Sequence, residues 1–206
     1  MTSAGRPNPW DLRYAGDAYK YGRDPNDFLR EMAGSIPSGP VLSLAEGEGR
    51  NAVFLAGLGH RVTGVDASAV AVDKGRRLAT DSEVASGVHF VHADLAEFPI
   101  EREAWAGVVS IFAHLPPHVR RSVHRRVVDG LEPGGVFILE AYTPDQLAHG
   151  TGGPPTADLM MDLETLREEL SGLKLDVARE VERDIHEGAL HHGRSSVVQI
   201  VGRKPG

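Results

Sequence analysis

Hydrophobic and polar positions along the chain follow two periods, one typical of buried strands and one typical of helices. Mostly apolar runs at 41–44 and 105–112 predict strands that are buried on both faces of a parallel sheet. Val119, Val123 and Val127 recur every fourth residue, which predicts a helix with one buried face. Strands and helices that alternate in this way indicate an α/β fold with a largely parallel sheet.

The other expected elements follow from the same pattern and from the Gly and Pro residues that interrupt it. Strands are expected at 41–44, 60–66, 88–93, 105–112, 136–141, 174–185 and 195–203, and helices at 51–58, 68–84, 116–130 and 162–170. The last two strands should form an antiparallel hairpin, joined through 187–193. The Gly- and Pro-rich stretch 142–156 is expected to be a mobile loop over the substrate side of the sheet.

The turn after the first strand carries the first chemical signal. It contains Gly47 and Gly49, and the helix at 51–58 follows directly. Glycine lets the backbone pass close beneath a ligand, and the first N–H groups of the helix point toward that ligand. A strand, a glycine turn and a helix in this order predict a nucleotide-type site at the carboxyl edge of the sheet.

Two acidic residues stand where the second and third strands end. Asp66 lies 17 residues after Gly49 and can accept hydrogen bonds from both hydroxyls of a ribose, or can cap the next helix. Asp94 can accept a hydrogen bond from an adenine amino group, or can also be a helix cap. We favour the nucleoside roles, because the glycine turn and Asp66 occur together at the expected spacing.

The end of the fourth strand is expected to lie nearest the chemistry, because ligands of open α/β sheets bind beyond the carboxyl ends of the strands. Phe112 and His114 occupy this position and are the candidate catalytic residues. His114 is the best-placed general base for work near neutral pH. A loop histidine that bonds only the backbone is the alternative.

An aromatic segment at 10–35 precedes the first strand. We interpret it as a lid over a bound ligand and a small substrate pocket, and the alternative is a helix that packs on the edge of the sheet. Aromatic walls suit a cationic group through cation–π attraction. Arg13 is a possible surface charge. The aromatic residues of this segment are Trp10, Tyr14, Tyr19, Tyr21 and Phe28.

Composition limits the classes of function. The chain has 206 residues, no cysteine and a net charge of −7, so we take 1–206 as one domain without disulfides or a thiolate nucleophile. The negative charge disfavours a nucleic-acid partner, and no apolar stretch is long enough to span a membrane. No histidine spacing suggests a metal site. Without an apolar signal segment, we expect a cytoplasmic protein, as a monomer or homodimer.

Several motifs together resemble those of the class I S-adenosylmethionine (SAM)-dependent methyltransferases. They are Leu44–Asn51 (LAEGEGRN), Val65-Asp66, Ala93-Asp94 and Leu131–Gly135 (LEPGG). These motifs are most similar to those of the small tellurite-resistance or thiopurine-type branch. Five further segments also resemble that branch: Trp10–Tyr14 (WDLRY), Tyr21-Gly22, Pro25–Leu29, His114–Pro117 and Glu187-Gly188. Ser43 and Ala45 depart from the family pattern, which has an acid and a glycine at these positions. The resemblance therefore predicts no ionic contact between the first strand and the methionine amine of SAM.

The resemblance implies a Rossmann-like fold with a seven-stranded sheet of order 3-2-1-4-5-7-6, an antiparallel last strand and helices on both faces. It implies SAM as the cofactor and S-adenosylhomocysteine as the product. The cofactor-binding residues are then expected to be Trp10, Tyr14, Ala45, Glu46, Gly47, Gly49, Asp66, Ala67, Ala93, Asp94, Leu95 and Ile111.

The acceptor is expected to be a small molecule with a soft nucleophile, a thiol or a reduced chalcogen species. SAM carries its own leaving group, so alignment and exclusion of water suffice for such an acceptor. The alternatives are an oxygen or nitrogen methyltransferase of a small metabolite, and a SAM-binding protein without turnover. A nicotinamide-dependent oxidoreductase is disfavoured, because the turn lacks the third small residue over which a pyrophosphate would sit.

Overall fold

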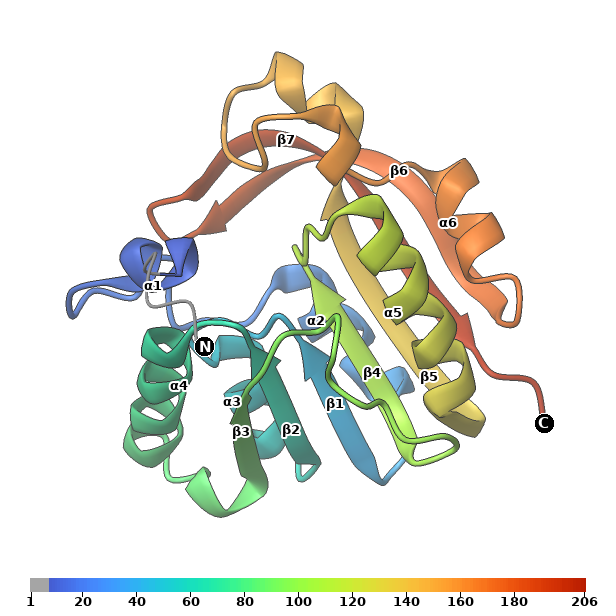
Figure 1. Cartoon of the computed structure of the whole chain (residues 1–206), viewed down its shortest axis with the longest axis horizontal. Helices are drawn as coiled ribbons and strands as arrows, with labels where there is room; N and C mark the ends of the chain where they lie inside the picture. The colour runs from blue at the N-terminus through green and yellow to red at the C-terminus, as the bar shows by residue number, and fades with distance from the viewer. Residues whose placement is uncertain (1–7) are drawn as a thin grey trace, which may run out of the picture.

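The computed structural model describes residues 8–206. Its strands form one seven-stranded sheet in the order β3-β2-β1-β4-β5-β7-β6 (Figure 1). Neighbouring strands from β1 to β5 are parallel, whereas β7 is antiparallel to β5 and to β6. The predicted fold is therefore confirmed, including its strand order. The strands are β1 (Pro40–Leu44), β2 (Arg61–Asp66), β3 (Val88–His92), β4 (Trp105–Ile111), β5 (Leu131–Tyr142), β6 (Lys174–Glu187) and β7 (His191–Arg203).

Helices cover both faces of this sheet. One hydrophobic core joins the sheet to α2, α3 and α4, and the core on the opposite face joins it to α5 and α6. The α-helices are α1 (Pro9–Tyr14), α2 (Asp27–Met32), α3 (Arg50–Gly57), α4 (Ala69–Asp81), α5 (Pro117–Gly130) and α6 (Leu163–Glu169), and short 3₁₀ helices are η1 (Ala33–Ser35), η2 (Ala85–Gly87), η3 (Pro144–Ala148) and η4 (Ala157–Leu159).

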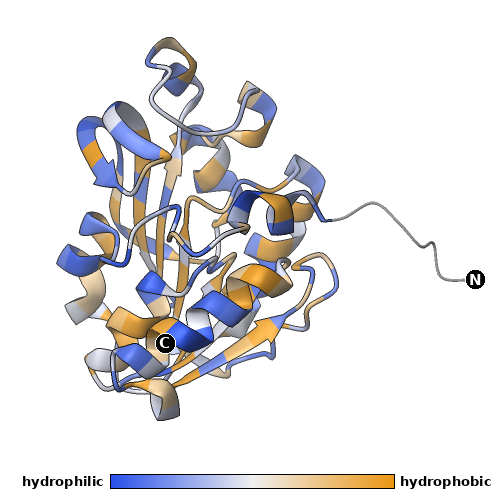
Figure 2. Ribbon diagram, turned by 90° about the vertical axis from the view of Figure 1, so that its left-hand side faces the viewer, coloured by the Kyte–Doolittle hydropathy of each residue, from blue (hydrophilic) through white to orange (hydrophobic). Residues whose placement is uncertain are grey.

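Successive residues of the central strands enter opposite cores, as the period of a strand requires. Val41 and Val109 pack on the side of α3, while Leu42 and Val108 pack on the side of α5. Both faces are buried, which is why these strands are almost continuously apolar. Figure 2 shows hydrophobic residues concentrated in the strands, while the helices carry hydrophobic and hydrophilic residues together.

The C-terminal strands differ from the sequence expectation. β6 and β7 are longer than predicted, and Glu187 pairs with His191 across a short turn that contains Gly188 at φ 69°. His191 and His192 therefore belong to a strand and not to a long connection. The reason is that the added residues, 186–187 of β6 and 191–194 of β7, are polar or glycine, so the apolar pattern does not extend over them. β5 also begins earlier than expected, at Leu131, which pairs with Trp105.

The β6–β7 hairpin arches over the carboxyl ends of the parallel strands and reaches the N-terminal segment (Figure 1). The N–H group of Ala189 donates to the carbonyl oxygen of Lys20 at 3.0 Å. A Cβ on Gly188 would lie 2.5 Å from the nitrogen of Gly22, so only glycine allows this approach. The hairpin tip and the N-terminal segment thus close over the same edge of the sheet.

Among residues 8–206, no helix combines the length and the apolar character that crossing a bilayer would require.

Candidate active site

A cavity of about 500 Å³ lies at the carboxyl ends of the parallel strands, where the order of strands reverses between β1 and β4. The N-terminal segment, the loop 152–155 and the hairpin tip cover it. Its volume is in the range of small-molecule sites. It is lined by Trp10, Arg13, Tyr14, Tyr21, Gly22, Ala45, Glu46, Gly47, Glu48, Arg50, Asn51, Asp66, Ala67, Asp94, Leu95, Ile111, Phe112, Ala113, His114, Leu115, Gly152, Gly153, Pro154, Pro155, Leu159, Leu190 and His191.

All the site residues predicted from the sequence line this cavity, except Gly49 and Ala93. Gly49 is the N-cap of α3 at φ 95°, and a Cβ there would lie 2.7 Å from the Cα of Gly75. The absence of a side chain at Gly49 allows α3 to pack closely on α4, and its role in cofactor binding stays a prediction. Ala93 instead donates its N–H to the carbonyl oxygen of Asp66 at 2.9 Å and holds the end of β3 against β2.

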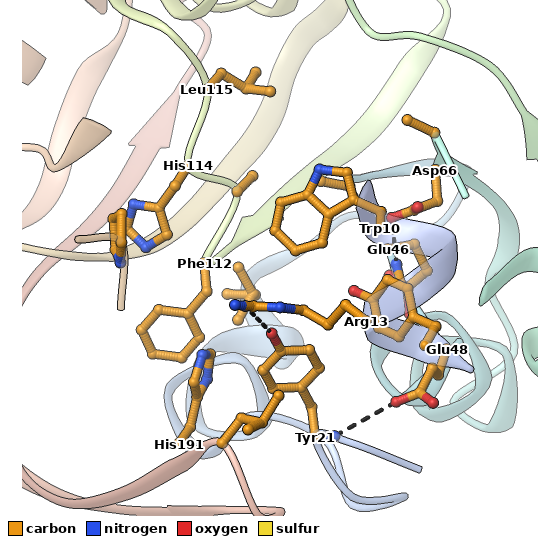
Figure 3. A pocket seen from close by; sticks show the side chains of 18 of the residues that line it. Trp10, Arg13, Tyr21, Glu46, Glu48, Asp66, Phe112, His114, Leu115 and His191 are labelled. Atoms are coloured by element: carbon orange, nitrogen blue, oxygen red, sulfur yellow. Dashed lines mark hydrogen bonds between the residues drawn. The ribbon is translucent and has the colours of Figure 1, made fainter. Parts of the chain in front are cut away.

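Asp66 ends β2 with its carboxylate beside the glycine turn (Figure 3). One carboxylate oxygen accepts from the N–H of Gly47 and the other from the N–H of Ser68, both at 2.8 Å. Burial raises the pKa of Asp66, and these two N–H groups oppose that shift. The side-chain cap of α4 is Ser68, so Asp66 is not the cap. Each oxygen keeps a free lone pair, which fits the two hydroxyls of a ribose.

Asp94 follows β3 and caps a turn, since its carboxylate accepts from the N–H of Ala96 at 2.8 Å. Both Asp94 and the next residue, Leu95, line the cavity. Capping occupies only one of the carboxylate's lone pairs. The residue can therefore cap the turn and also accept from an adenine amino group.

Glu46 supplies a buried acid close to where the family pattern has one in the first strand. Its carboxylate accepts from the hydroxyl of Ser43 and from the N–H groups of Asn51 and Ala52, at 3.1 and 2.9 Å. These bonds cap α3, whose N-cap residue has no side chain. Burial raises the pKa of Glu46 to about 7, while its hydrogen bonds hold it down. A Cβ on Gly64 would lie 3.1 Å from this side chain, so Gly64 provides its space.

Glu48, the other acid of the turn, holds the N-terminal segment in place. Its carboxylate accepts from the N–H of Lys20 at 2.7 Å and from the ammonium group of Lys74 at 2.8 Å. Lys74 also donates to the carbonyl oxygen of Ala18 at 2.8 Å. Both charged side chains are almost fully buried. The glycine turn, α4 and the segment before α2 are therefore joined by one ion pair.

The aromatic residues of the N-terminal segment divide between the cavity and the core. Trp10, Tyr14 and Tyr21 line the cavity, whereas Phe28 packs on the sheet. The hydroxyl of Tyr14 would lie 2.9 Å from a Cβ on Gly47, so the ring covers the glycine turn. Burial raises the pKa of Tyr14, so it is un-ionised at neutral pH.

The end of β4 carries a cluster of aromatic rings. Phe112 is held at φ 53°, an uncommon conformation for a residue with a side chain, and donates its N–H to the carbonyl oxygen of Glu140 at 2.8 Å. Its ring lies 4.6 Å from the rings of both Tyr142 and His191. The ring of His114 stacks on Tyr142 at 5.6 Å. These rings fix the side chains that lie closest to the expected reaction centre.

The tautomer of His114 is set by the backbone. Its Nδ1 lies 3.0 Å from the carbonyl oxygen of Leu159, which can only accept, so Nδ1 carries the proton. Nε2 then has a free lone pair, and it is buried without a hydrogen-bond partner in residues 8–206. Burial lowers the pKa of His114 to about 4, so the ring is neutral at pH 7. Burial likewise lowers the pKa of His191 to about 3.

A network of buried polar side chains joins α2, α3 and the β6–β7 hairpin, which lie far apart along the chain. Glu187 of the hairpin pairs with Arg50 of α3 and, at 3.0 Å, with Arg183. The side-chain amide of Asn26 donates to both Glu140 and Glu187. Burial alone would raise the pKa of Glu187, but Arg50 and Arg183 lower it. The network fastens the hairpin to α2 and α3.

Several residues that line the cavity have no local signal in the sequence. Arg13 was left as a possible surface charge, and the roles of Glu48 and Arg50 depend on partners 26 and 137 residues away along the chain. His191 is expected from the sequence only as part of the connection 187–193 in the terminal hairpin. The one available signal was Gly188, since a glycine-centred turn would have placed His191 at the start of a strand.

Comparisons with known proteins agree with the fold. The model of a family described as a methyltransferase domain matches residues 41–135. A curated relative, the 2-heptyl-1-hydroxyquinolin-4(1H)-one methyltransferase of Mycobacteroides abscessus, is 25% identical over 149 residues, which are 69% of this chain. The aligned part spans 61% of the length of that relative.

Solved structures share the whole architecture. A protein studied for the conversion of a disulfide bond into a thioacetal group during echinomycin biosynthesis superposes with a TM-score of 0.76 at 20% identity, covering 95% of this chain and 90% of its own. TehB from Haemophilus influenzae gives 0.69 at 18% identity, covering 86% of this chain and 61% of its own.

Residues 41–135, which contain the glycine turn, Asp66 and Asp94, match a methyltransferase domain, and the sheet has the strand order expected for SAM-dependent methyltransferases. These two findings support SAM as the cofactor. The narrower tellurite-resistance or thiopurine-type branch stays a prediction.

Proposed function

We propose that the protein transfers a methyl group from SAM to the hydroxyl group of a small, planar aromatic acceptor. When bound, SAM supplies a methyl group on a sulfonium sulfur, which needs no covalent intermediate on the protein. In this proposal Asp66 holds the ribose, Asp94 the adenine, and the turn at Gly47 lies under the methionine. The segment 10–35 is the lid that excludes water.

The observation that carries this proposal is that Nε2 of His114, at the wall of the cavity, has no hydrogen-bond partner in the described part of the chain. A buried imidazole nitrogen without a hydrogen bond costs free energy, which a donor from the acceptor would recover after a small local adjustment. An O–H group is a strong donor, whereas S–H is a weak one. A hydroxyl acceptor therefore suits this nitrogen better than the thiol expected from the sequence.

The basicity of His114 bears on when the proton moves. Its pKa of about 4 makes it a weak base, and its Nδ1 is held by a neutral carbonyl rather than by a carboxylate. A base this weak takes the proton only as methyl transfer makes the hydroxyl strongly acidic, so an acceptor that is un-ionised at neutral pH depends on it. The relative's name, which describes a 1-hydroxyquinolinone as the substrate, supports a hydroxyl on a planar ring.

A thiol or reduced chalcogen acceptor is the second candidate, and the same weak base supports it. Thiols ionise near pH 8.5 without help, so they depend little on His114. We place either reaction in the cytoplasm, on a small molecule and not on nucleic acid or a membrane, with the protein as a monomer or homodimer.

Replacement of His114 by Gln separates the two candidates. With an aromatic hydroxyl acceptor, we expect the kcat of His114→Gln to fall by roughly 10²-fold or more, because the proton acceptor is lost. With a thiol acceptor, the rate should change little and recover as the pH rises toward 9. His118→Gln, on the exposed start of α5, is the matched control. An unchanged rate on hydroxyl acceptors, with high turnover of thiols, would reject the hydroxyl proposal.

A further inference from the structure

Arg13 differs from the other arginine of the cavity wall. Arg50 is paired with the buried carboxylate of Glu187. Arg13 has no carboxylate within 4.0 Å among residues 8–206, and its one side-chain hydrogen bond there joins its guanidinium to the hydroxyl of Tyr21 at 3.0 Å. The guanidinium therefore keeps its positive charge and most of its N–H donors available to a ligand.

The side chain of Arg13 points toward the acceptor end of the cavity. Tyr21, to which it is bonded, lies 4.5 Å from His191 between ring centroids, and His191 lies 4.6 Å from Phe112. In Figure 3 the guanidinium extends toward Phe112 and away from Asp66. Asp66 marks the ribose end in our proposal, so the free cation belongs to the opposite end.

The guanidinium is also held in a fixed orientation. It lies 5.3 Å from the ring of Trp10, and the bond to Tyr21 holds it from the other side. A planar guanidinium that is stacked and bonded in this way loses less conformational entropy when it binds an anion. Carboxylates and conjugated oxyanions match its paired N–H donors.

We infer that Arg13 recognises an anionic oxygen group on the methyl acceptor, so the enzyme selects hydroxylated aromatic acids, or rings whose hydroxyl is conjugated to a charge-bearing oxygen. The inference rests on the proposed function, in which the acceptor lies beside Phe112 and His114. Arg13 then holds the anionic group while His114 faces the hydroxyl, and the two residues set the orientation of the ring. Arg13 is thus a specificity-determining residue.

Binding measurements with charge-matched probes test this role without turnover. The probes are the three positional isomers of hydroxybenzoate and the corresponding hydroxybenzamides, which differ in charge and hardly in size. Their affinities are measured by calorimetry in the presence of S-adenosylhomocysteine. We expect at least one hydroxybenzoate to bind the wild type better than its amide, and Arg13→Gln to weaken that hydroxybenzoate roughly 10- to 100-fold while sparing the amide.

The matched control is Arg23→Gln. Arg23 belongs to the same segment and lies 5.3 Å from the ring of Tyr19, but it is paired with Asp81 outside the cavity. Arg23→Gln should leave the affinities for the hydroxybenzoates and for the hydroxybenzamides unchanged. Both arginines are exposed, so neither variant should alter the melting temperature appreciably.

A second comparison separates the acceptor from the cofactor, which also has a carboxylate. S-adenosylhomocysteine and 5′-methylthioadenosine differ by the amino-acid portion that bears it. If Arg13→Gln weakens S-adenosylhomocysteine, spares methylthioadenosine and leaves the hydroxybenzoates unchanged, Arg13 binds the cofactor and the inference is overturned. A wild type without any preference for the charged probes also overturns it.

The inference and the proposed function fail in different ways. Thiosalicylate and its amide repeat the comparison with sulfur in place of the hydroxyl oxygen. Methylation of thiosalicylate on sulfur, with no methylation of any hydroxybenzoate on oxygen and with a charge preference that depends on Arg13, would reject the hydroxyl proposal and support the role of Arg13. Methylation on oxygen with equal affinity for charged and uncharged probes would do the reverse.

Discussion

The ammonium group of Lys74 and the carboxylate of Glu48 meet at 2.8 Å inside the protein, where each side chain is at most 3% exposed. The same carboxylate accepts from the N–H of Lys20, so the ion pair connects α4 and the glycine turn to the segment that covers the cavity. A buried pair of this kind costs free energy to desolvate and is strongly destabilising when only one partner is removed. The pair therefore links the stability of the fold to the closure of the site.

Glu48→Gln should lower the free energy of unfolding by about 3 kcal/mol, because Lys74 is left buried without its counter-charge. The measurement is urea unfolding at pH 7.5. The double variant with Lys74→Met should recover at least half of the loss, and Asp73→Asn, in an exposed pair, should change stability by less than about 0.5 kcal/mol. If Glu48→Gln lowers the free energy of unfolding by less than about 1 kcal/mol, the ion pair does not hold the N-terminal segment in place.

Asp66→Asn should weaken SAM binding roughly 10- to 100-fold, since the charged acceptor of the ribose hydroxyls becomes a neutral amide. Calorimetric titration with SAM measures the effect. Asp94→Asn should weaken binding less, because backbone contacts to adenine remain. If Asp66→Asn binds SAM within twofold of the wild type, the ribose role of Asp66 is wrong.

His114 should make stability depend on pH in a defined direction. Its folded-state pKa of about 4 lies below the ordinary value of 6.5, so the native protein binds fewer protons than the unfolded chain. The stabilisation is complete above pH 6.5 and is lost as the pH falls toward 4. Over these 2.5 pH units, from 6.5 to 4, one neutral buried histidine is worth about 3 kcal/mol.

Other groups also titrate between pH 4 and 7, so the test compares the stability of the wild type with that of a variant without His114. Glu46, with its pKa raised to about 7, acts in the opposite direction, and His191 in the same one. The stability of the wild type minus that of His114→Gln should shrink by about 3 kcal/mol between pH 7 and pH 4. A difference that stays constant with pH would mean that His114 is not buried as a neutral ring.

The parts of the fold that could be predicted are those with a local cause. The strands β1 and β4 are apolar because both faces are buried, and the turn at Gly47 is marked by its own residues. The role of Asp66 could be predicted because it ends the second strand at the expected spacing from the glycine turn. The resemblance supplied the strand order.

The rest depends on partners far away in the chain. The sequence shows that an acid is missing at Ser43, but not that Glu46 turns back to bond Ser43 and cap α3. It does not show that Nδ1 of His114 faces Leu159, 45 residues later, which sets the tautomer. It also could not show that Arg13 lacks an ionic partner among residues 8–206, since pairing is decided by tertiary contacts.

The measurement that tests the central claim most directly is the transfer of an isotopically labelled methyl group from SAM. The purified protein is incubated with labelled SAM and a panel of aromatic hydroxyl compounds, including 1-hydroxyquinolin-4(1H)-one, and matched thiols. Mass spectrometry and NMR then locate the label. We predict formation of S-adenosylhomocysteine with the label on the acceptor's hydroxyl oxygen. Label found on sulfur alone, or SAM bound without transfer to any acceptor, would contradict the account.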